Sequence, residues 1–376
     1  MMTARNTSHI AHAAVALYPN RAHEAQHERV SLGELARRIA GLQGLPYYGE
    51  FNPEQALAES LYLVPSGTLI GLEEARALGV ANEQDLFGGV VPLPFVATKA
   101  ISHGLVGAGA QAPQGWPETF AAQAGDALLD GFTAFDLGDA REAGQRLLRQ
   151  GRMRVKPVRA TAGRGQWLVE DTEALEQALA AQDADEVNAF GLVLEQHLDE
   201  VLTYSVGQVR IGELLATYHG RQRLTEDNAG ETVYGGSDLV VVRGDFDALL
   251  RLDLPDPVRL AVSQSQRYDA AASACFPALI ASRRNYDVAQ GRDAHGRQRS
   301  GVLEQSWRIG GASSAEIAAL ETFHADPTVT RVRASSLEFF GEARQPPTHA
   351  SVLFRGLDPE IGFMTKCVTV EAYEGT

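Results

Sequence analysis

Cysteine is almost absent from this chain, because only Cys275 and Cys367 occur among its 376 residues. The two lie far apart and neither has a second metal-type ligand at short spacing, so the sequence predicts neither a disulfide framework nor a zinc ribbon. We expect a cytoplasmic protein in a reducing compartment. The sequence starts without a basic segment followed by an apolar one, and no apolar run approaches the roughly 20 residues that cross a bilayer, so we expect no membrane contact.

Basic residues are fewer than acidic ones: the chain has 33 Lys and Arg residues and 48 Asp and Glu residues, which give a net charge of −15. This balance argues against a nucleic-acid partner, which rewards clustered basic residues. The sequence contains no phosphate-binding P-loop, no Gly-x-Ser-x-Gly elbow and no repeat of fixed period. With 44% hydrophobic residues, the chain is long enough for two or three subdomains of an enzyme. Assembly as a homodimer is left open.

One metal-type motif does occur, because the segment from His23 to His27 matches the H-E-x-x-H pattern of zinc proteases. A zinc-protease helix needs an apolar face with which to pack on the rest of the protein, and residues 20 to 29 contain almost no large apolar side chain. No third ligand is apparent nearby. We therefore interpret the motif as a solvated polar segment, followed by a helix that Ser31 caps and that ends at Gly41.

A hairpin over residues 153 to 170 is the most informative stretch of the sequence. A β-like run that contains Lys156 leads into a loop with Gly163 and Gly165, and a second β-like run follows. Glycine has no Cβ, so such a tip lets backbone N–H groups approach an anion, and Lys156 and Arg164 add positive charge. The pattern indicates phosphate binding, with a purely structural hairpin as the alternative.

A second hairpin carries two acids. The β-like runs 284 to 288 and 301 to 304 flank a hydrophilic turn, and each run contributes one carboxylate, Asp287 or Glu304. If the two carboxylates converge without a partner, each raises the pKa of the other, and a cation relieves the repulsion. Mg²⁺ prefers such oxygen ligands and keeps positions free for phosphate and water. The alternative is a surface hairpin held by salt bridges.

These segments, in this order, resemble the ATP-grasp superfamily, which includes glutathione synthetase and D-alanine–D-alanine ligase. A lysine precedes a glycine-rich loop, an apolar strand over residues 190 to 198 carries Glu-x-x-Leu, and a late strand is acidic. The resemblance covers about residues 95 to 340. It implies an α/β (α+β) fold with a small N-terminal α/β subdomain (residues 1–95), a lid (96–198) and a C-terminal catalytic subdomain (199–345), followed by a C-terminal tail (346–376).

The resemblance also implies roles for individual residues. ATP would be held through its phosphates, its adenine and its ribose, and the residues implied are Lys99, Lys156, Gly163, Gly165, Glu195, Gln196, Leu198 and Glu200. Mg²⁺, or Mn²⁺, would be bound by Asp287, Glu304 and Ser306, where the serine replaces the asparagine of the family. Arg308 would stabilise the transferred phosphoryl group. A surface lysine is the alternative for Lys99, and the family usually places the ribose acid later than Glu200, near Leu202 or Thr203.

The implied reaction is ligation. A carboxylate would be phosphorylated by ATP to an acyl phosphate, and an amine or thiol would displace the phosphate. A small-molecule kinase and a non-catalytic nucleotide sensor are the alternatives, the second because Ser306 is a weaker oxygen donor than asparagine. A polar loop from His219 to Ser237 is a candidate substrate loop or a solvated one. Ser313 and Glu316 predict a capping box at the start of a late helix.

Overall fold

The computed structural model describes residues 12–54, 60–159 and 165–373. The chain opens with a parallel sheet in the order β2-β1-β3, formed by β1 (Ala14–Tyr18), β2 (Tyr47–Glu50) and β3 (Leu61–Pro65). Helix α1 (Gln26–Gln43) joins β1 to β2 and buries Leu32, Leu35 and Ile39. A short connecting region follows, with β4 (Leu69–Ile70), α2 (Leu72–Ala77), β5 (Gly89–Val91), η1 (Pro94–Ala97) and η2 (Lys99–Ser102).

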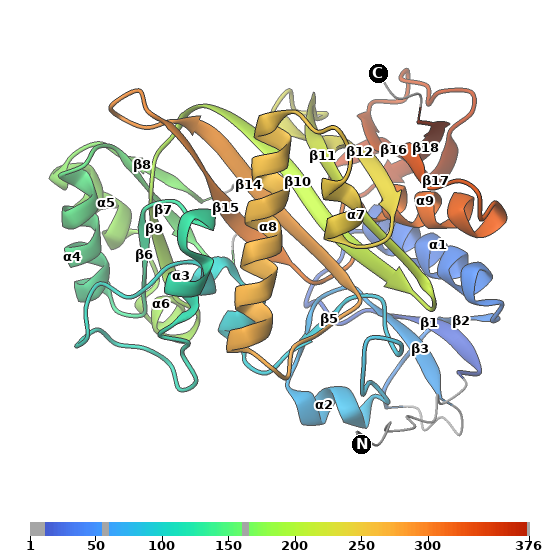
Figure 1. Cartoon of the computed structure of the whole chain (residues 1–376), viewed down its shortest axis with the longest axis horizontal. Coiled ribbons are helices and arrows are strands. Elements are labelled where there is room, and N and C mark those ends of the chain that lie inside the picture. Colours follow the sequence, from blue (N-terminus) through green and yellow to red (C-terminus); the bar gives the residue numbers. More distant parts are fainter. Residues whose placement is uncertain (1–11, 55–59, 160–164, 374–376) are drawn as a thin grey trace.

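A second unit lies at the left of Figure 1 and has its own apolar core. Its sheet has the order β6-β9-β7-β8 and is made of β6 (Gly131–Ala134), β7 (Met153–Pro157), β8 (Trp167–Val169) and β9 (Leu192–Gln196). The helices of this unit are α4 (Leu137–Leu148), α5 (Thr172–Ala180) and α6 (Ala184–Phe190), whereas α3 (Phe120–Ala124) and η3 (Gly125–Ala127) pack against α8 (Asp256–Cys275). The antiparallel pairing of β7 with β8 confirms the predicted hairpin, and Gly163 at its tip lies outside the described residues.

The largest sheet is antiparallel, with the order β15-β14-β10-β11-β12-β16-β18-β17. Its strands are β10 (Asp199–Ile211), β11 (Leu214–Glu226), β12 (Thr232–Arg243), β14 (Arg283–Arg292), β15 (Gln298–Ser306), β16 (Arg331–Phe340), β17 (Ser351–Asp358) and β18 (Gly362–Ala372). Helix α8 (Asp256–Cys275), preceded by α7 (Phe246–Leu250), crosses β10 and β14 in Figure 1. Helices α1 and α9 (Ser313–Ala325) pack into a separate core with β11, β12 and β16. Strand β13 (Ile280–Ala281) pairs with β5.

Two sequence predictions about helix starts are wrong. Helix α1 begins at Gln26, and Ser31 lies inside it, where its Oγ donates to the carbonyl oxygen of His27. Helix α9 begins at Ser313 without a side-chain cap, because Glu316 is fully buried against Arg283 instead of capping the helix. Ser31 therefore bonds within its own helix, whereas a tertiary contact with Arg283 uses the Glu316 side chain that the local pattern assigned to capping.

The predicted polar loop from His219 to Ser237 is also wrong. Strand β11 continues to Glu226 and β12 begins at Thr232, so only five residues form the turn. The outer half of β11 is exposed and polar, which hid its strand character in the sequence. In the part of the chain that the structure describes, no helix is long and apolar enough to cross a membrane.

Candidate functional site

Asp287 and Glu304 face each other directly across the antiparallel β14–β15 pair, as the hairpin pattern predicted. Residues in that relation project from the same face of a sheet. Burial, together with the negative charge of Glu304, raises the pKa of Asp287 to about 6. Gln222 and Asn285 each donate a side-chain amide N–H to Asp287, both at 3.1 Å. Asp287 is therefore held by neutral donors and keeps its affinity for a cation.

Lys99 lies beside this carboxylate pair. It is only 8% exposed, and its Nζ is 2.7 Å from Oε2 of Glu304. The alternative of a surface lysine is therefore wrong. The 3₁₀ turn η2 presents the lysine where the connecting region reaches β15, so an ammonium group already stands next to the predicted metal ligands.

A buried hydrogen-bond network lies behind the pair and fixes its geometry. Asn285 accepts hydrogen bonds on Oδ1 from Ser205 (2.7 Å) and Tyr218 (2.8 Å), so its amide nitrogen must face Asp287. Ser306 lies opposite Asn285, and Nη1 of Arg283 is 3.3 Å from its Oγ. The serine hydroxyl thus has a cationic neighbour, and its role as a metal ligand stays a prediction.

Arg308 follows β15 and is half-buried. Its Nη1 donates to the carbonyl oxygen of Ile309 at 3.0 Å, and no carboxylate of the described residues lies within ion-pair distance of it. Burial lowers the pKa of Arg308, and the neighbouring guanidinium groups of Arg21 and Arg283 lower it further. An unneutralised guanidinium among other cations is suited to bind an anion.

Lys156 and Glu195 form a second group, on the paired strands β7 and β9. Lys156 donates to Oε1 of Glu195, and His103 lies 3.0 Å from Oε2 of the same carboxylate. All three side chains are buried. Burial by itself would raise the pKa of Glu195, but the charges and hydrogen bonds of Lys156 and His103 lower it to about 2.

The strand end after Glu195 offers one unused donor. The backbone N–H of Gln196 donates to Asp130, but its side-chain Nε2 is buried without a hydrogen-bond partner. Leu198 is buried, whereas Glu200 is exposed and 3.3 Å from Arg292. Glu200 has φ 52°, a left-handed conformation at a bulge in the β10–β14 pairing, so its side chain leaves the regular alternation of the strand.

These features fit a magnesium-bound nucleotide. The opposed carboxylates supply oxygen ligands, Lys99 and Arg308 supply cationic groups for phosphate, and the amide of Gln196 could donate to a base. Among residues 12–54, 60–159 and 165–373, no three His, Cys, Asp or Glu side chains are placed to share a metal ion. A metal at Asp287 and Glu304 would therefore need phosphate oxygens to complete its coordination.

Gly165, which lies between β7 and β8, has φ 69°, a backbone conformation that favours glycine.

Lysine usage is a signal that the sequence analysis missed. The chain has only three lysines, Lys99, Lys156 and Lys366, against many arginines. Each is paired with a glutamate, Lys366 with Glu338 at 3.1 Å across β16 and β18. The supporting residues Gln222 and Asn285 were missed as well, because neither carries a motif and only the sheet register brings them to Asp287.

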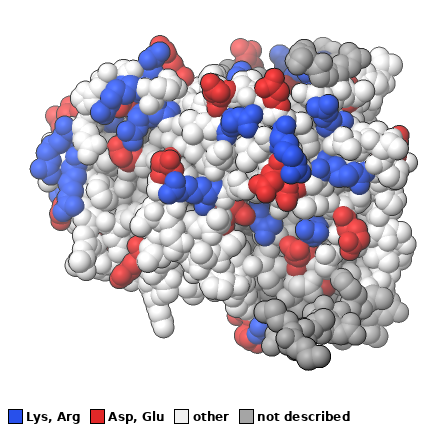
Figure 2. Space-filling model, viewed as in Figure 1, with Lys and Arg blue, Asp and Glu red and all other residues white. Residues whose placement is uncertain are grey.

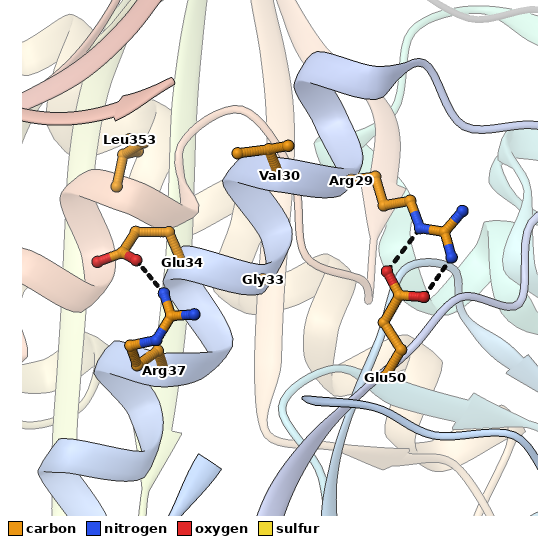
Figure 3. Close-up of a pocket in the computed structure, with 7 residues that line it drawn as sticks. All are labelled: Arg29, Val30, Gly33, Glu34, Arg37, Glu50 and Leu353. Atoms are coloured by element: carbon orange, nitrogen blue, oxygen red, sulfur yellow. Dashed lines mark hydrogen bonds and ion pairs between the residues drawn. The ribbon is translucent and has the colours of Figure 1, made fainter. Parts of the chain in front are cut away.

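One surface depression is a competing candidate, but its charged side chains are already engaged. The depression in Figure 3 lies between α1, β2 and β17 and has a volume of about 390 Å³. Its charged side chains are already paired, Arg29 with Glu50 and Arg37 with Glu34. On the face shown in Figure 2, acidic and basic side chains are intermixed.

Comparison with solved structures identifies the fold. Biotin carboxylase from Campylobacter jejuni superposes with a TM-score of 0.52 at 10% identity, over 95% of this chain and 87% of that one. Phosphoribosylamine–glycine ligase from Thermotoga maritima gives 0.52 at 13% identity, over 96% and 93%. The chain has an ATP-grasp fold. A family model described as "Protein of unknown function (DUF3182)" matches residues 15–368, and no curated protein matches.

Proposed function

The chain belongs to this family of proteins of unknown function, DUF3182, and we propose that it is an ATP- and Mg²⁺-dependent ligase that joins a carboxylate to an amine or thiol through an acyl phosphate. The observation that carries the proposal is the opposed pair Asp287 and Glu304, with Lys99 at 2.7 Å from Glu304. By their names, one of the two similar structures is a ligase and the other a carboxylase.

The residues of the site have separable tasks in this proposal. Asp287 and Glu304 would hold the cation, which, when bound, neutralises phosphate charge and orients the reacting phosphoryl group. Lys99 and Lys156 would contact phosphate oxygens, and Arg308 would stabilise the charge of the transferred phosphoryl group or of the acyl phosphate. Because Lys156 is paired with Glu195 in the structure, its contact with phosphate requires a change in that ion pair. Positioning and electrostatics would supply most of the rate.

A product analysis with Mg-ATP tests the proposal. ADP and free phosphate, formed only with a carboxylate and a nucleophile, support the ligase. ADP with a stable phosphorylated product supports a kinase. Nucleotide binding without turnover supports a sensor, a reading that the contact between Ser306 and Arg283 favours because it occupies the serine hydroxyl. Absence of nucleotide binding by calorimetry would refute all three.

A further inference from the structure

Gln305 lies between Glu304 and Ser306 on β15, but its side chain turns away from the predicted metal site. Successive residues of a strand point to opposite faces of the sheet, so Gln305 projects into the apolar core that contains Tyr268 and Val96. It is only 5% exposed there. A buried amide is costly unless its polar atoms have partners, so those partners indicate its role.

The amide nitrogen of Gln305 binds the turn that carries Lys99. Its Nε2 donates to the carbonyl oxygen of Thr98 at 2.7 Å and to that of Val96 at 3.1 Å. Val96 belongs to η1, and Thr98 is the residue that caps the start of η2. One side chain therefore uses both of its amide hydrogens to join the η1–η2 turn to β15.

The oxygen of the same amide is held by helix α8. The hydroxyl of Tyr268 donates to Oε1 of Gln305 at 2.9 Å, and it lies 2.9 Å from Oγ of Ser102 at the end of η2. Tyr268 gives its only proton to Gln305, so Ser102 is the donor in the second contact. Because the carbonyl oxygens at Nε2 only accept, the amide of Gln305 has a single orientation that satisfies all of these contacts.

Lys99 is the first residue of η2, the turn that is fastened in this way. Gln305 binds the carbonyl oxygen of the residue before Lys99, and the adjacent Glu304 binds the Lys99 ammonium group at 2.7 Å. Neighbouring residues of β15 thus hold the backbone and the charged end of the same lysine. A methionine of similar size would fill this part of the core without the cost of a buried amide.

We propose that Gln305 is a positioning residue, which holds the η1–η2 turn so that the ammonium group of Lys99 stands beside Glu304. Gln305 contacts neither metal nor nucleotide in this role and acts through Lys99. A lysine whose backbone is already fixed loses less conformational freedom when it binds phosphate. The consequence for phosphate rests on the proposed ligase function, whereas the hold on the turn is a property of the free protein.

Gln305→Met tests the hold on the turn, because it keeps the side-chain volume and removes both donors. Amide hydrogen exchange of the full chain should become roughly fivefold to thirtyfold faster in residues 95 to 103, the change expected when one or two buried hydrogen bonds are lost. Gln264→Met is the matched control. Gln264 is also 5% exposed, and its Nε2 also donates to two carbonyl oxygens, those of Asp126 (2.7 Å) and Ser300 (3.1 Å).

The control variant should leave the exchange of residues 95 to 103 as it is in the wild type. Equal exchange of this segment in Gln305→Met and Gln264→Met would overturn the inference. If Gln305→Met does not fold, Tyr268→Phe takes its place, because it removes only the hydroxyl that orients the amide. Exchange of the same segment should then rise by a smaller factor, and wild-type exchange in Tyr268→Phe would overturn the inference in that case.

A double-mutant cycle with Lys99→Met tests whether Gln305 acts through the lysine. Calorimetry with Mg²⁺ and a non-hydrolysable ATP analogue compares the wild type, the two single variants and the double variant. Gln305→Met should weaken nucleotide binding roughly twofold to tenfold, and should have no further effect once Lys99 is replaced. An equal loss in both backgrounds would show a structural role alone and refute the inference. If the wild type binds no nucleotide, the ligase is refuted, and hydrogen exchange decides whether Gln305 holds the turn.

Discussion

The two groups of buried charge in this protein differ in what the fold supplies to them. On β9, Glu195 receives both Lys156 and His103, and its pKa falls to about 2. On the large sheet, Asp287 receives only amide donors and stands opposite Glu304, so its pKa rises to about 6. In the first group, the carboxylate of Glu195 already has its charge partners within the protein. In the second group the ammonium of Lys99 pairs with Glu304, but the side chains that donate to Asp287 are neutral amides, which is the condition expected of a carboxylate that a cation completes.

The largest expected effect comes from removing a carboxylate of the incomplete group. Asp287→Ala should lower ATP turnover by roughly a thousandfold or more, because the cation loses one of its two carboxylate ligands. The free protein should stay folded and be as stable as the wild type or more so, since one of two repelling charges is gone. Steady-state ADP release and a thermal melt measure the two effects. Undiminished turnover would remove the main support for the ligase.

Breaking the group formed by Lys156, Glu195 and His103 should instead lower the stability of the fold. Lys156→Met leaves Glu195 buried with His103 alone and should lower the free energy of unfolding by about 3–5 kcal/mol near neutral pH. The depressed pKa of Glu195 means that its stabilisation is present above its unfolded value near 4.5 and is lost as the pH falls toward 2. Denaturant unfolding at several pH values measures this.

A matched pair of variants controls that experiment. Lys156→Met combined with Glu195→Gln should recover much of the loss, because the uncompensated charge is removed. Lys366→Met interrupts a more exposed lysine–glutamate pair and should cost less. If Lys156→Met and the wild type have equal free energies of unfolding, the ion pair between Lys156 and Glu195 does not stabilise the fold.

A smaller expected effect is the release of protons from Asp287 when Mg-nucleotide binds. The native state holds the proton of Asp287 more tightly than the unfolded chain does, so this group lowers stability as the pH rises from 3.8 through about 6. Mg-nucleotide binding favours the ionised carboxylate and should release protons near pH 6. Below that pH, affinity should fall by about 1.4 kcal/mol per pH unit. Calorimetry in buffers of different ionisation enthalpy measures the release, which should vanish in Asp287→Asn.

The smallest effect should follow Ser306→Asn. Asparagine restores the oxygen donor that the superfamily normally uses and reaches further than serine past Arg283, so Mg-nucleotide affinity should stay the same or rise by about 1 kcal/mol at most. Titration with Mn²⁺ in the presence of nucleotide measures this affinity. A large loss would show that the serine hydroxyl has a structural role through Arg283.

The sequence predicted those parts of the fold that depend on local pattern. The hairpin of β7 and β8 and the opposed positions of Asp287 and Glu304 follow from the alternation of apolar residues and from turn composition. The register of the β14–β15 pair was accessible because one polar turn connects the two strands.

Features that depend on contacts between distant segments were not accessible. Lys156 is buried with Glu195 and His103, which come from other parts of the chain, and no local pattern shows that these three side chains meet. Glu316 meets Arg283 across two elements, which turned a predicted cap into a buried ion pair. Glu24 belongs to a motif that the sequence analysis interpreted as solvated, but its side chain is only 6% exposed and lies 3.5 Å from Arg21.

The scarcity of lysine makes this protein a natural subject for chemical footprinting. Each of the three lysines is engaged with a glutamate, and two of them are less than 10% exposed. Acylating reagents attack free, accessible amines, so modification of each lysine should be slow while its ion pair persists. Mass spectrometry of three peptides would then follow the opening of each pair separately, without any engineered label.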